Sequence, residues 1–205
     1  MKLKVLAILT TLALAPVSQA ALIAFSGVNV PIPTTFSGVY VDLVNNTTST
    51  APAAGAHLNL FFGGAGLSND ADAGAVVPSL QFLRVGTANN DAARNSPLGT
   101  VIDASSPSYS TGFGSSGSPN THLGVGAPSF IDGTIGYLGF TFDLSGTPVY
   151  GFAEVTLTAN GAGVLHGWAY EDTGAPITIT SPVPEPSAGL LALVSAGVLA
   201  MRRRR

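Results

Sequence analysis

A short polar stretch, SNDADAG at residues 68–74, holds the residues best suited to bind a metal ion. Asn69, Asp70 and Asp72 lie within four residues of one another, ahead of Gly74. Closely spaced oxygen ligands on a flexible loop are what Ca²⁺ requires. The stretch lacks the third ligand pair and the late glutamate of an EF-hand, so a solvated turn is the alternative. Calcium is therefore the one cofactor for which the sequence offers a candidate site.

Three further carboxylates, Glu154, Glu171 and Asp172, lie on neighbouring strand-like segments. Two carboxyl groups catalyse glycoside hydrolysis when they stand about 5 to 9.5 Å apart across a cleft. A secreted hydrolase acting on polysaccharide is thus one hypothesis. Asp172 also begins the string D-T-G-A, which surrounds the catalytic aspartates of pepsin-like proteases. No second D-T-G occurs and Glu171 precedes the aspartate, so a turn is expected there.

The chain has three histidines, His57, His122 and His166, and no cysteine. The histidines lack a metal-ligand spacing such as H-x-x-x-H, so structural or solvated roles are expected for them. The lack of cysteine excludes thiol nucleophiles and zinc–thiolate centres. A G-x-S-x-G elbow and a glycine-rich phosphate loop with its lysine are also missing from the sequence. No catalytic residue is therefore assigned.

Short strands joined by turns must position these groups. Only 9% of the residues are charged and 46% are hydrophobic, with 25 glycines and 14 prolines, which is typical of short strands and many turns. Strands are expected over residues 21–30, 36–44, 56–62, 76–85, 136–146, 149–159, 163–172 and 175–180. The last four are expected to form an antiparallel meander with a first turn at residues 145–148.

The segment GYLGFTFDLSG shows the clearest strand pattern. One face would carry Leu138, Phe140, Phe142 and Leu144, and the other Tyr137, Gly139, Thr141 and Asp143. One buried face and one solvated face predict an all-β fold, an antiparallel β-sandwich or jelly-roll ectodomain over residues 21–181. Within it, residues 88–134 are rich in Ser, Gly, Pro and Asn and are expected to form a long loop region.

The predicted ectodomain is strongly acidic. It contains ten of the 11 acidic residues but only two basic ones, Arg84 and Arg94, which gives a net charge of −8. This charge argues against nucleic acid or an anionic membrane surface as a partner. Cations and uncharged ligands such as sugars are compatible with it.

Residues 1–20 have the three parts of a secretory signal peptide. Lys2 and Lys4 supply the positive charge, an apolar helical core follows, and residues 18–20 form a small-x-small site. Cleavage is expected between Ala20 and Ala21. A buried N-terminal helix is the alternative, although the order of these parts favours export. The mature chain is therefore expected to begin at Ala21, outside the cytoplasm.

Residues 182–205 also have three parts. The triplet Pro184, Glu185 and Pro186 resists helix formation and leaves extended, accessible backbone. Residues 187–201 are 15 apolar, uncharged residues. A helix of that length covers about 22 Å of a hydrocarbon core of about 30 Å, so a short, marginal transmembrane helix is expected. The chain closes with a cluster expected on the cytoplasmic side: Arg202, Arg203, Arg204 and Arg205.

This order of parts resembles the PEP-CTERM sorting signal of Gram-negative bacteria that make exopolysaccharide. The resemblance implies that a membrane-embedded exosortase recognises Pro184, Glu185 and Pro186 and removes the tail near this motif. It also implies that the arginine cluster, Arg202 to Arg205, is the stop signal. The strings YVDLVNNTTSTAP and GYLGFTFDL resemble segments of PEP-CTERM cargo proteins as well.

These features favour a non-enzymatic, exported cell-surface or extracellular-matrix protein. Its expected partners are an exosortase-type processing enzyme, the inner membrane transiently, and exopolysaccharide. Exposed Tyr, Trp and Asn side chains on a β-sandwich are expected to contact carbohydrate. The alternatives are the secreted hydrolase, a carbohydrate-binding module and a permanently anchored membrane protein.

Overall fold

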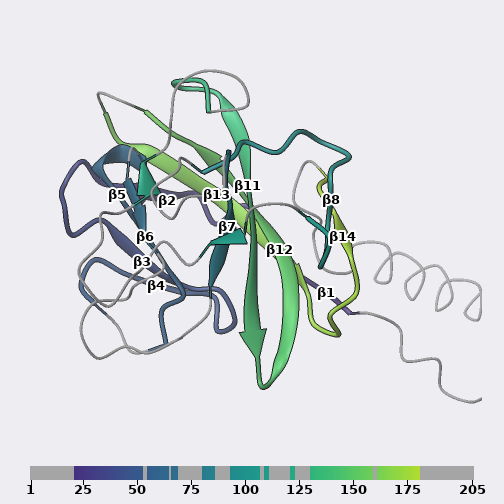
Figure 1. Cartoon of the computed structure of the whole chain (residues 1–205). Coiled ribbons are helices and arrows are strands. Elements are labelled where there is room, and N and C mark those ends of the chain that lie inside the picture. The colour runs from purple at the N-terminus through teal and green to yellow at the C-terminus, as the bar shows by residue number, and fades with distance from the viewer. Residues whose placement is uncertain are drawn as a thin grey trace, which may run out of the picture.

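The computed structural model describes most of the predicted ectodomain. The described residues are 21–52, 55–64, 66–68, 80–85, 93–106, 109–110, 121–122, 130–158 and 161–180. Their regular structure consists of fourteen β strands and one short 3₁₀ helix, Phe62–Gly64 (Figure 1). All the strand pairs among them are antiparallel, so the predicted all-β fold is confirmed. The expected signal helix and transmembrane helix lie outside the described residues.

The larger sheet has seven strands arranged around one long hairpin. They are β1 (Leu22–Phe25), β2 (Val30–Ile32), β7 (Gln81–Leu83), β9 (Tyr109–Ser110), β11 (Ile135–Leu144), β12 (Thr147–Thr156) and β13 (Gly163–Glu171). The spatial order is β1-β13-β12-β11-β7-β9, and β2 pairs with the other end of β13. The three longest strands thus lie side by side and form the scaffold of the domain.

The β11–β12 hairpin confirms the alternation expected from the sequence. Its apolar set, including Phe140 and Phe142, is buried in the main core. The turn is shorter than expected, because Thr147 and Pro148 already belong to β12 and pair with Leu144 and Asp143. Ser145 and Gly146 make a two-residue turn with φ values of 56° and 89°, the left-handed geometry that suits a tight hairpin.

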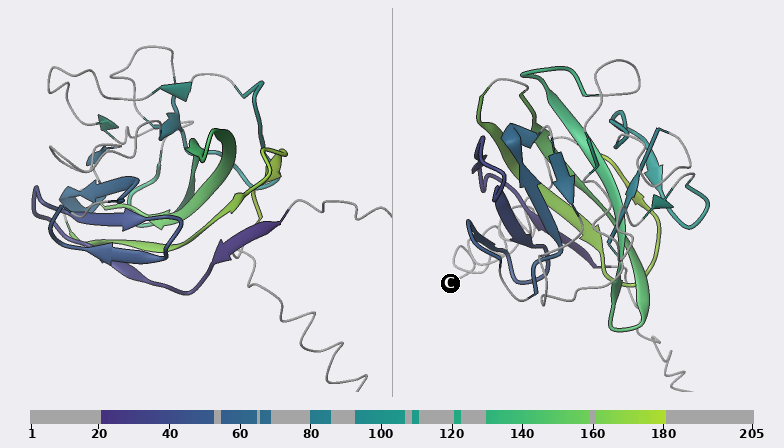
Figure 2. Two further views of the ribbon diagram at one scale, coloured as in Figure 1. Left: turned by 90° about the horizontal axis from the view of Figure 1, so that it is seen from below. Right: turned by 60° about the vertical axis from the view of Figure 1, so that its left-hand side comes forward.

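A second sheet packs against one face of this scaffold. It contains β3 (Val39–Asp42), β4 (Thr47–Ser49), β5 (Leu58–Phe61), β6 (Gly66–Ser68) and β10 (Thr121–His122), in the order β10-β6-β5-β3-β4. Figure 2 shows the two sheets as stacked layers. Val41, Leu58 and Leu60 from the second sheet share one core with Phe140, Val155 and Trp168 from the first. Burying such side chains from both sheets supplies most of the driving force for folding.

The outer face of the larger sheet is covered at one end, which corrects the expectation of a solvated face. A two-stranded sheet, β8 (Val101–Ile102) with β14 (Ile177–Thr178), lies there. Ile102 and Ile177 form a second apolar cluster with Tyr137, Phe152 and their neighbours. Tyr137 and Phe152 are therefore buried although they point away from the main core.

One expectation about connectivity was wrong. Residues 175–180 do not continue the meander, because β14 pairs with β8 instead of joining the larger sheet beside β13. The predicted long loop of residues 88–134 contains three short strands, β8, β9 and β10. Two-residue strands of this kind are defined by long-range pairing and leave almost no periodic signal in the sequence.

Three consecutive residues after β5 adopt left-handed backbone conformations. Phe62, Gly63 and Gly64 have φ values of 51°, 69° and 94°. Gly63 donates its N–H to the Pro33 carbonyl at 2.9 Å, and its own carbonyl accepts from the Thr158 N–H at 3.1 Å. A Cβ atom at Gly63 would overlap the carbonyl oxygen of Gly161. This turn therefore needs glycine for space as well as for backbone freedom.

Gly63→Ala is expected to destabilise the domain by about 1–3 kcal/mol more than Gly146→Ala. Both glycines have positive φ, but no atom lies within 4 Å of a Cβ built on Gly146. The comparison therefore isolates the overlap with Gly161 from the cost of a left-handed alanine. Urea unfolding followed by Trp168 fluorescence measures both variants, and equal losses would contradict the packing described for the Gly63 turn.

Candidate functional site

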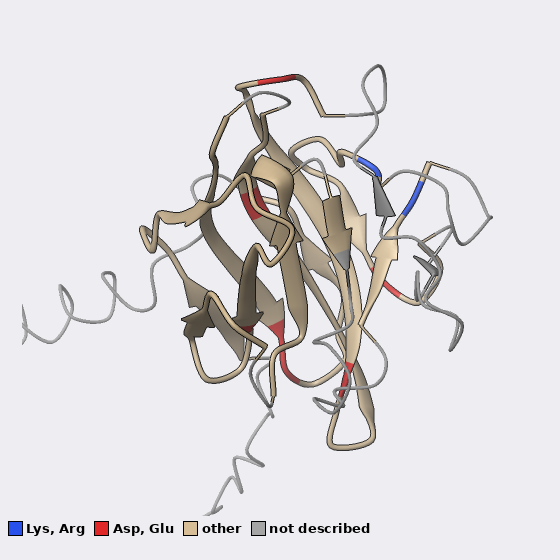
Figure 3. Cartoon of the chain, turned by 90° about the vertical axis from the view of Figure 1, so that its left-hand side faces the viewer, with Lys and Arg blue, Asp and Glu red and all other residues tan. Residues whose placement is uncertain are grey.

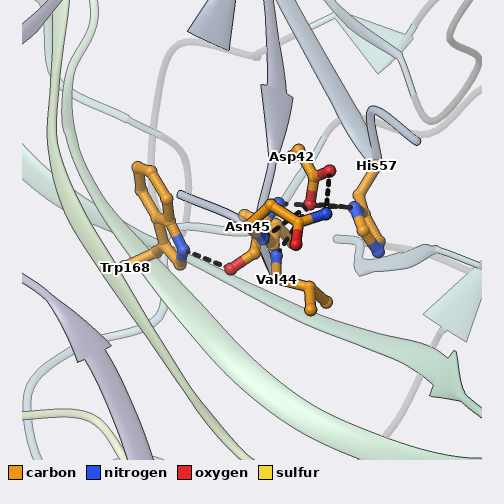
Figure 4. A network of polar contacts seen from close by, with 6 residues as sticks. Asp42, Val44, Asn45, His57 and Trp168 are labelled. Atoms are coloured by element: carbon orange, nitrogen blue, oxygen red, sulfur yellow. Dashed lines mark hydrogen bonds and ion pairs between the residues drawn. The ribbon is translucent and has the colours of Figure 1, made fainter. Parts of the chain in front are cut away.

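Asp42 is the centre of a polar network that closes the turn between β3 and β4. Its Oδ1 accepts hydrogen bonds from the N–H groups of Val44 and Asn45 at 3.0 and 2.9 Å, and its Oδ2 accepts from Asn45 Nδ2 at 2.7 Å (Figure 4). The side chain is buried. Asn46 completes the turn with a φ of 53°. The carboxylate of Asp42 is thus occupied by the turn that follows it, as an aspartate at this position favours.

His57 lies beside Asp42, but the two do not form a proton-transfer pair. Its Nδ1 is 3.6 Å from Asp42 Oδ1 and accepts a hydrogen bond from the Leu43 N–H at 3.3 Å. A nitrogen that accepts carries no proton, which places the ring proton on Nε2. Burial lowers the pKa of His57, while the Asp42 charge and a backbone hydrogen bond with Gly55 partly offset this effect. A neutral, 6% exposed ring packed edge-on against Phe142 is a structural histidine.

The same turn is tied to the opposite sheet through Trp168. The indole Nε1–H of Trp168, on β13, donates to the carbonyl of Leu43 at 2.9 Å (Figure 4). Trp168 is fully buried, and Phe25 on β1 packs against it with 5.3 Å between ring centroids. The network around Asp42 therefore joins the two sheets, and its carboxylate is occupied by the turn that follows β3.

The carboxylates suggested for hydrolysis are not brought together. Glu171 is buried, and its carboxylate accepts from the N–H and hydroxyl of Thr173 and from the N–H of Ala175. In register, Glu171 lies opposite Tyr150, whereas Glu154 lies four residues further along β12. Four residues of strand span about 13 Å, which exceeds the separation that glycoside hydrolysis uses. The D-T-G-A string forms a turn, as expected, with Gly174 at a φ of 83°.

A groove on the outer face of the larger sheet is the candidate binding site. It has a volume of about 310 Å³ and lies where β8 and β14 leave the sheet uncovered. A row of paired residues, Gln81, Thr141 and Tyr150, crosses its floor from β7 through β11 to β12. Asp143 and Pro148 line it near the hairpin turn, and Ala104 lines it from the turn after β8.

The chemistry of the groove suits binding more than catalysis. Its described lining contains an amide, two hydroxyls, aromatic rings and one carboxylate, Asp143. Thr141 Oγ1 donates to the Val149 carbonyl at 2.8 Å, which fixes the orientation of this hydroxyl. A small number of oriented polar groups beside aromatic surface is the usual make-up of a site for a small polar ligand such as a sugar. A single carboxylate does not provide the acid and base of a glycosidase.

The expectation of exposed tyrosine and tryptophan was wrong for the described side chains. Trp168 is fully buried, and Tyr40, Tyr137, Tyr150 and Tyr170 are each 3–7% exposed. The exposed aromatic residues are instead Phe36 and Phe62, at 68% and 43%. They pack against each other with 5.8 Å between ring centroids. The two glycines that follow Phe62 were the only sequence signal that it would lie in a turn.

Most residues assigned from the sequence lie outside the described structure. These are Ala20, Asn69, Asp70, Asp72, Pro184, Glu185, Pro186, Arg202, Arg203, Arg204 and Arg205. Ala21 is described, and its N–H donates to Asp172 Oδ1 at 3.2 Å.

The described histidines do not converge. His166 lies on β13, where its ring contacts Thr156 Oγ1 at 2.8 Å and Asn29 Oδ1 at 3.1 Å. Within the described ranges, His, Asp and Glu residues form no group of three that could hold a metal ion. The calcium candidate at residues 68–74 is not tested by this, because its ligands lie outside those ranges.

Together the fold and groove define an all-β protein of antiparallel sheets with a polar groove on one outer face. In comparisons with known proteins, no family model, no curated protein and no solved structure matches the chain. In the part of the chain that the structure describes, no helix is long and apolar enough to cross a membrane. Residues 187–201, for which such a helix is expected, lie outside that part.

Acidification is expected to destabilise the domain through His57. The pKa of this ring is lowered in the folded state, so the unfolded chain takes up the proton first, near the ordinary value of 6.5. The free energy of unfolding should therefore fall as the pH drops below about 6.5, until the folded ring is protonated as well. Urea unfolding at a series of pH values measures this slope.

His57→Gln should remove this part of the pH dependence. His166→Gln is the matched control, because it changes a histidine on β13 and leaves His57 in place. An unchanged pH slope in His57→Gln would contradict the lowering of the His57 pKa by burial.

Proposed function

We propose that this chain is an exported cell-surface or extracellular-matrix protein, sorted through a PEP-CTERM/exosortase pathway and non-enzymatic. The observation that carries the proposal is the C-terminal order of a Pro184-Glu185-Pro186 triplet, a short apolar run and four terminal arginines. Each part has a physical role: an extended recognition strip, a marginal membrane span and a charge that keeps the end in the cytoplasm.

The proposed route begins with export and ends at the cell surface. The signal peptide directs the chain across the inner membrane and is removed before Ala21, while residues 187–201 hold the precursor in that membrane. An exosortase-type enzyme then releases the ectodomain near Pro184, Glu185 and Pro186. The absence of cysteine means that the domain needs no disulfide formation after export.

The exported part is proposed to be a β-sandwich that associates with exopolysaccharide. The two stacked sheets and their shared core support the sandwich. The groove at Thr141 and Tyr150 supports a sugar contact, because its lining includes an amide, two hydroxyls and one carboxylate without a cluster of charge. Of the alternatives, the groove favours a carbohydrate-binding module. It holds a single carboxylate, and Glu154 and Glu171, which were suggested for the hydrolase, are four residues apart in register.

The net negative charge of the domain is compatible with a position beside exopolysaccharide outside the cytoplasm. In Figure 3 the acidic residues are spread over the described elements, and the basic residues are confined to one side. These basic residues are Arg84 and Arg94, whose segments are joined by the bridge between Arg84 and Ala93. An acidic surface of this kind disfavours nucleic acid as a partner.

Deletion of residues 184–205 is expected to abolish correct surface placement while leaving the ectodomain folded. The described core is formed by residues between Ile23 and Ile179, all of which the deletion retains, so the change is expected to affect sorting alone. Cell fractionation with immunoblotting of the exported protein measures placement, and the urea unfolding midpoint of the ectodomain measures folding. Unchanged placement of the truncated protein would contradict sorting by this tail.

A narrower pair of variants separates recognition from membrane anchoring. Pro184→Ala combined with Pro186→Ala should leave an unprocessed precursor in the inner membrane, because the apolar run and arginines remain. Ser187→Ala, the neighbouring residue, is the matched control and should be processed normally. Equal processing of the double variant and of Ser187→Ala would show that the Pro184-Glu185-Pro186 triplet is not the recognition element.

A further inference from the structure

The first strand of the ectodomain begins beside Asp172, where Ala21 and Asp172 each donate a hydrogen bond to the other. Ala21 immediately precedes β1, and Asp172 immediately follows β13, with Leu22 opposite Glu171 in register. The Ala21 N–H donates to Asp172 Oδ1 at 3.2 Å, and the Asp172 N–H donates to the Ala21 carbonyl at 3.3 Å. The antiparallel ladder therefore continues one step past β1, and a carboxylate faces its last nitrogen.

This nitrogen is the atom that signal-peptide cleavage would change. Hydrolysis of the bond between Ala20 and Ala21 consumes one water and leaves a carboxylate on Ala20. It also leaves an amine on Ala21, which takes up a proton at neutral pH. A neutral amide donor thereby becomes a cationic group with three N–H donors, at the position already directed at Asp172. Hydrogen bonds between ionised partners are roughly twice as strong as neutral ones.

We propose that cleavage after Ala20 creates an ion pair between the α-ammonium group of Ala21 and the carboxylate of Asp172, which fastens β1 to β13 in the mature protein. The proposal rests on the cleavage site assumed in the proposed export route. It gives Asp172 a role that the D-T-G-A turn alone does not require.

The groups around the new cation favour such a pair. The acidic groups nearest in sequence and register are Asp172 and Glu171, and the Glu171 carboxylate is already occupied by Thr173 and Ala175. Among the described residues the basic side chains are Arg84 and Arg94, at the β7 end of the sheet order, with β11, β12 and β13 between β7 and β1. Tyr170 is the neighbouring phenol, and its pKa is raised by burial first and by the Asp172 charge second.

Holding β1 in place matters because this edge strand is short and packs against Trp168. It has four residues, and Leu22 at its start is 44% exposed. Phe25 at its end packs on Trp168, the residue that joins the two sheets. Strand ends fray when little holds them, so an ion pair at the first residue protects the contact at the last.

The test measures the α-amino group in a chain of residues 21–205, prepared in mild detergent with Ala21 as its first residue. Competitive acetylation across a pH series, read by mass spectrometry of the N-terminal peptide, gives the pKa of this amine. An ordinary α-amino group titrates at about 7.7–8.0. Asp172 should raise this pKa by a few tenths, so that the amine of Asp172→Asn acetylates about twofold faster at neutral pH.

Two controls separate the pair from a general change in charge or fold. Asp132→Asn removes a remote carboxylate and should acetylate at the wild-type rate, whereas Asp172→Glu retains the charge and should stay slow. In the wild-type chain, added salt should speed acetylation towards the Asp172→Asn rate, because the contact is exposed. The salt response is measured in the wild-type chain, so it does not depend on whether Asp172→Asn folds. Equal rates in the wild-type and Asp172→Asn chains, together with no salt response, would overturn the pair.

N-terminal sequencing of the exported protein tests the underlying cleavage separately. Ala21 as the first residue supports the proposal, and any other first residue overturns it in the cell. Neither result depends on the C-terminal tail, so failure here is distinct from failure of the proposed sorting route.

Discussion

The hydrogen bond from the Trp168 indole to the Leu43 carbonyl is the constraint on which the rest of the structure depends. It joins β13 of the larger sheet to the turn after β3 of the second sheet, across a fully buried core. A buried donor that loses its partner costs about 1–3 kcal/mol, so the two sheets are held in one relative position. The Asp42 turn must keep its conformation for the Leu43 carbonyl to remain in place.

This constraint explains why so few charged groups are left for chemistry. Asp42 and Glu171 are both buried, and each uses its carboxylate to hold the turn that follows its strand. His57 is neutral and packed between Asp42 and Phe142. A hollow with polar lining lies on the outer face of the larger sheet, beside Thr141 and Asp143 near the β11–β12 hairpin turn.

Some of these features could be predicted from the sequence, and others could not. Strict alternation placed Phe140 and Phe142 in the core, because a strand that buries one face must repeat every two residues. The pairing of β14 with β8 was not predictable, because it joins segments about 75 residues apart and depends on which sheet face remains uncovered. The buried state of Tyr150 was missed for the same reason, whereas Trp168 is buried in the core between the two stacked sheets. The contact between Ala21 and Asp172 spans 151 residues and has no local signal.

We propose above all that both terminal segments direct export and are then removed. The intact mass of the envelope-associated protein tests this proposal most directly. We expect a chain that begins at Ala21 and ends close to Pro184, Glu185 and Pro186. A mass equal to that of residues 1–205 or 21–205 would contradict it, because the apolar run and the arginine cluster would then persist in the working protein.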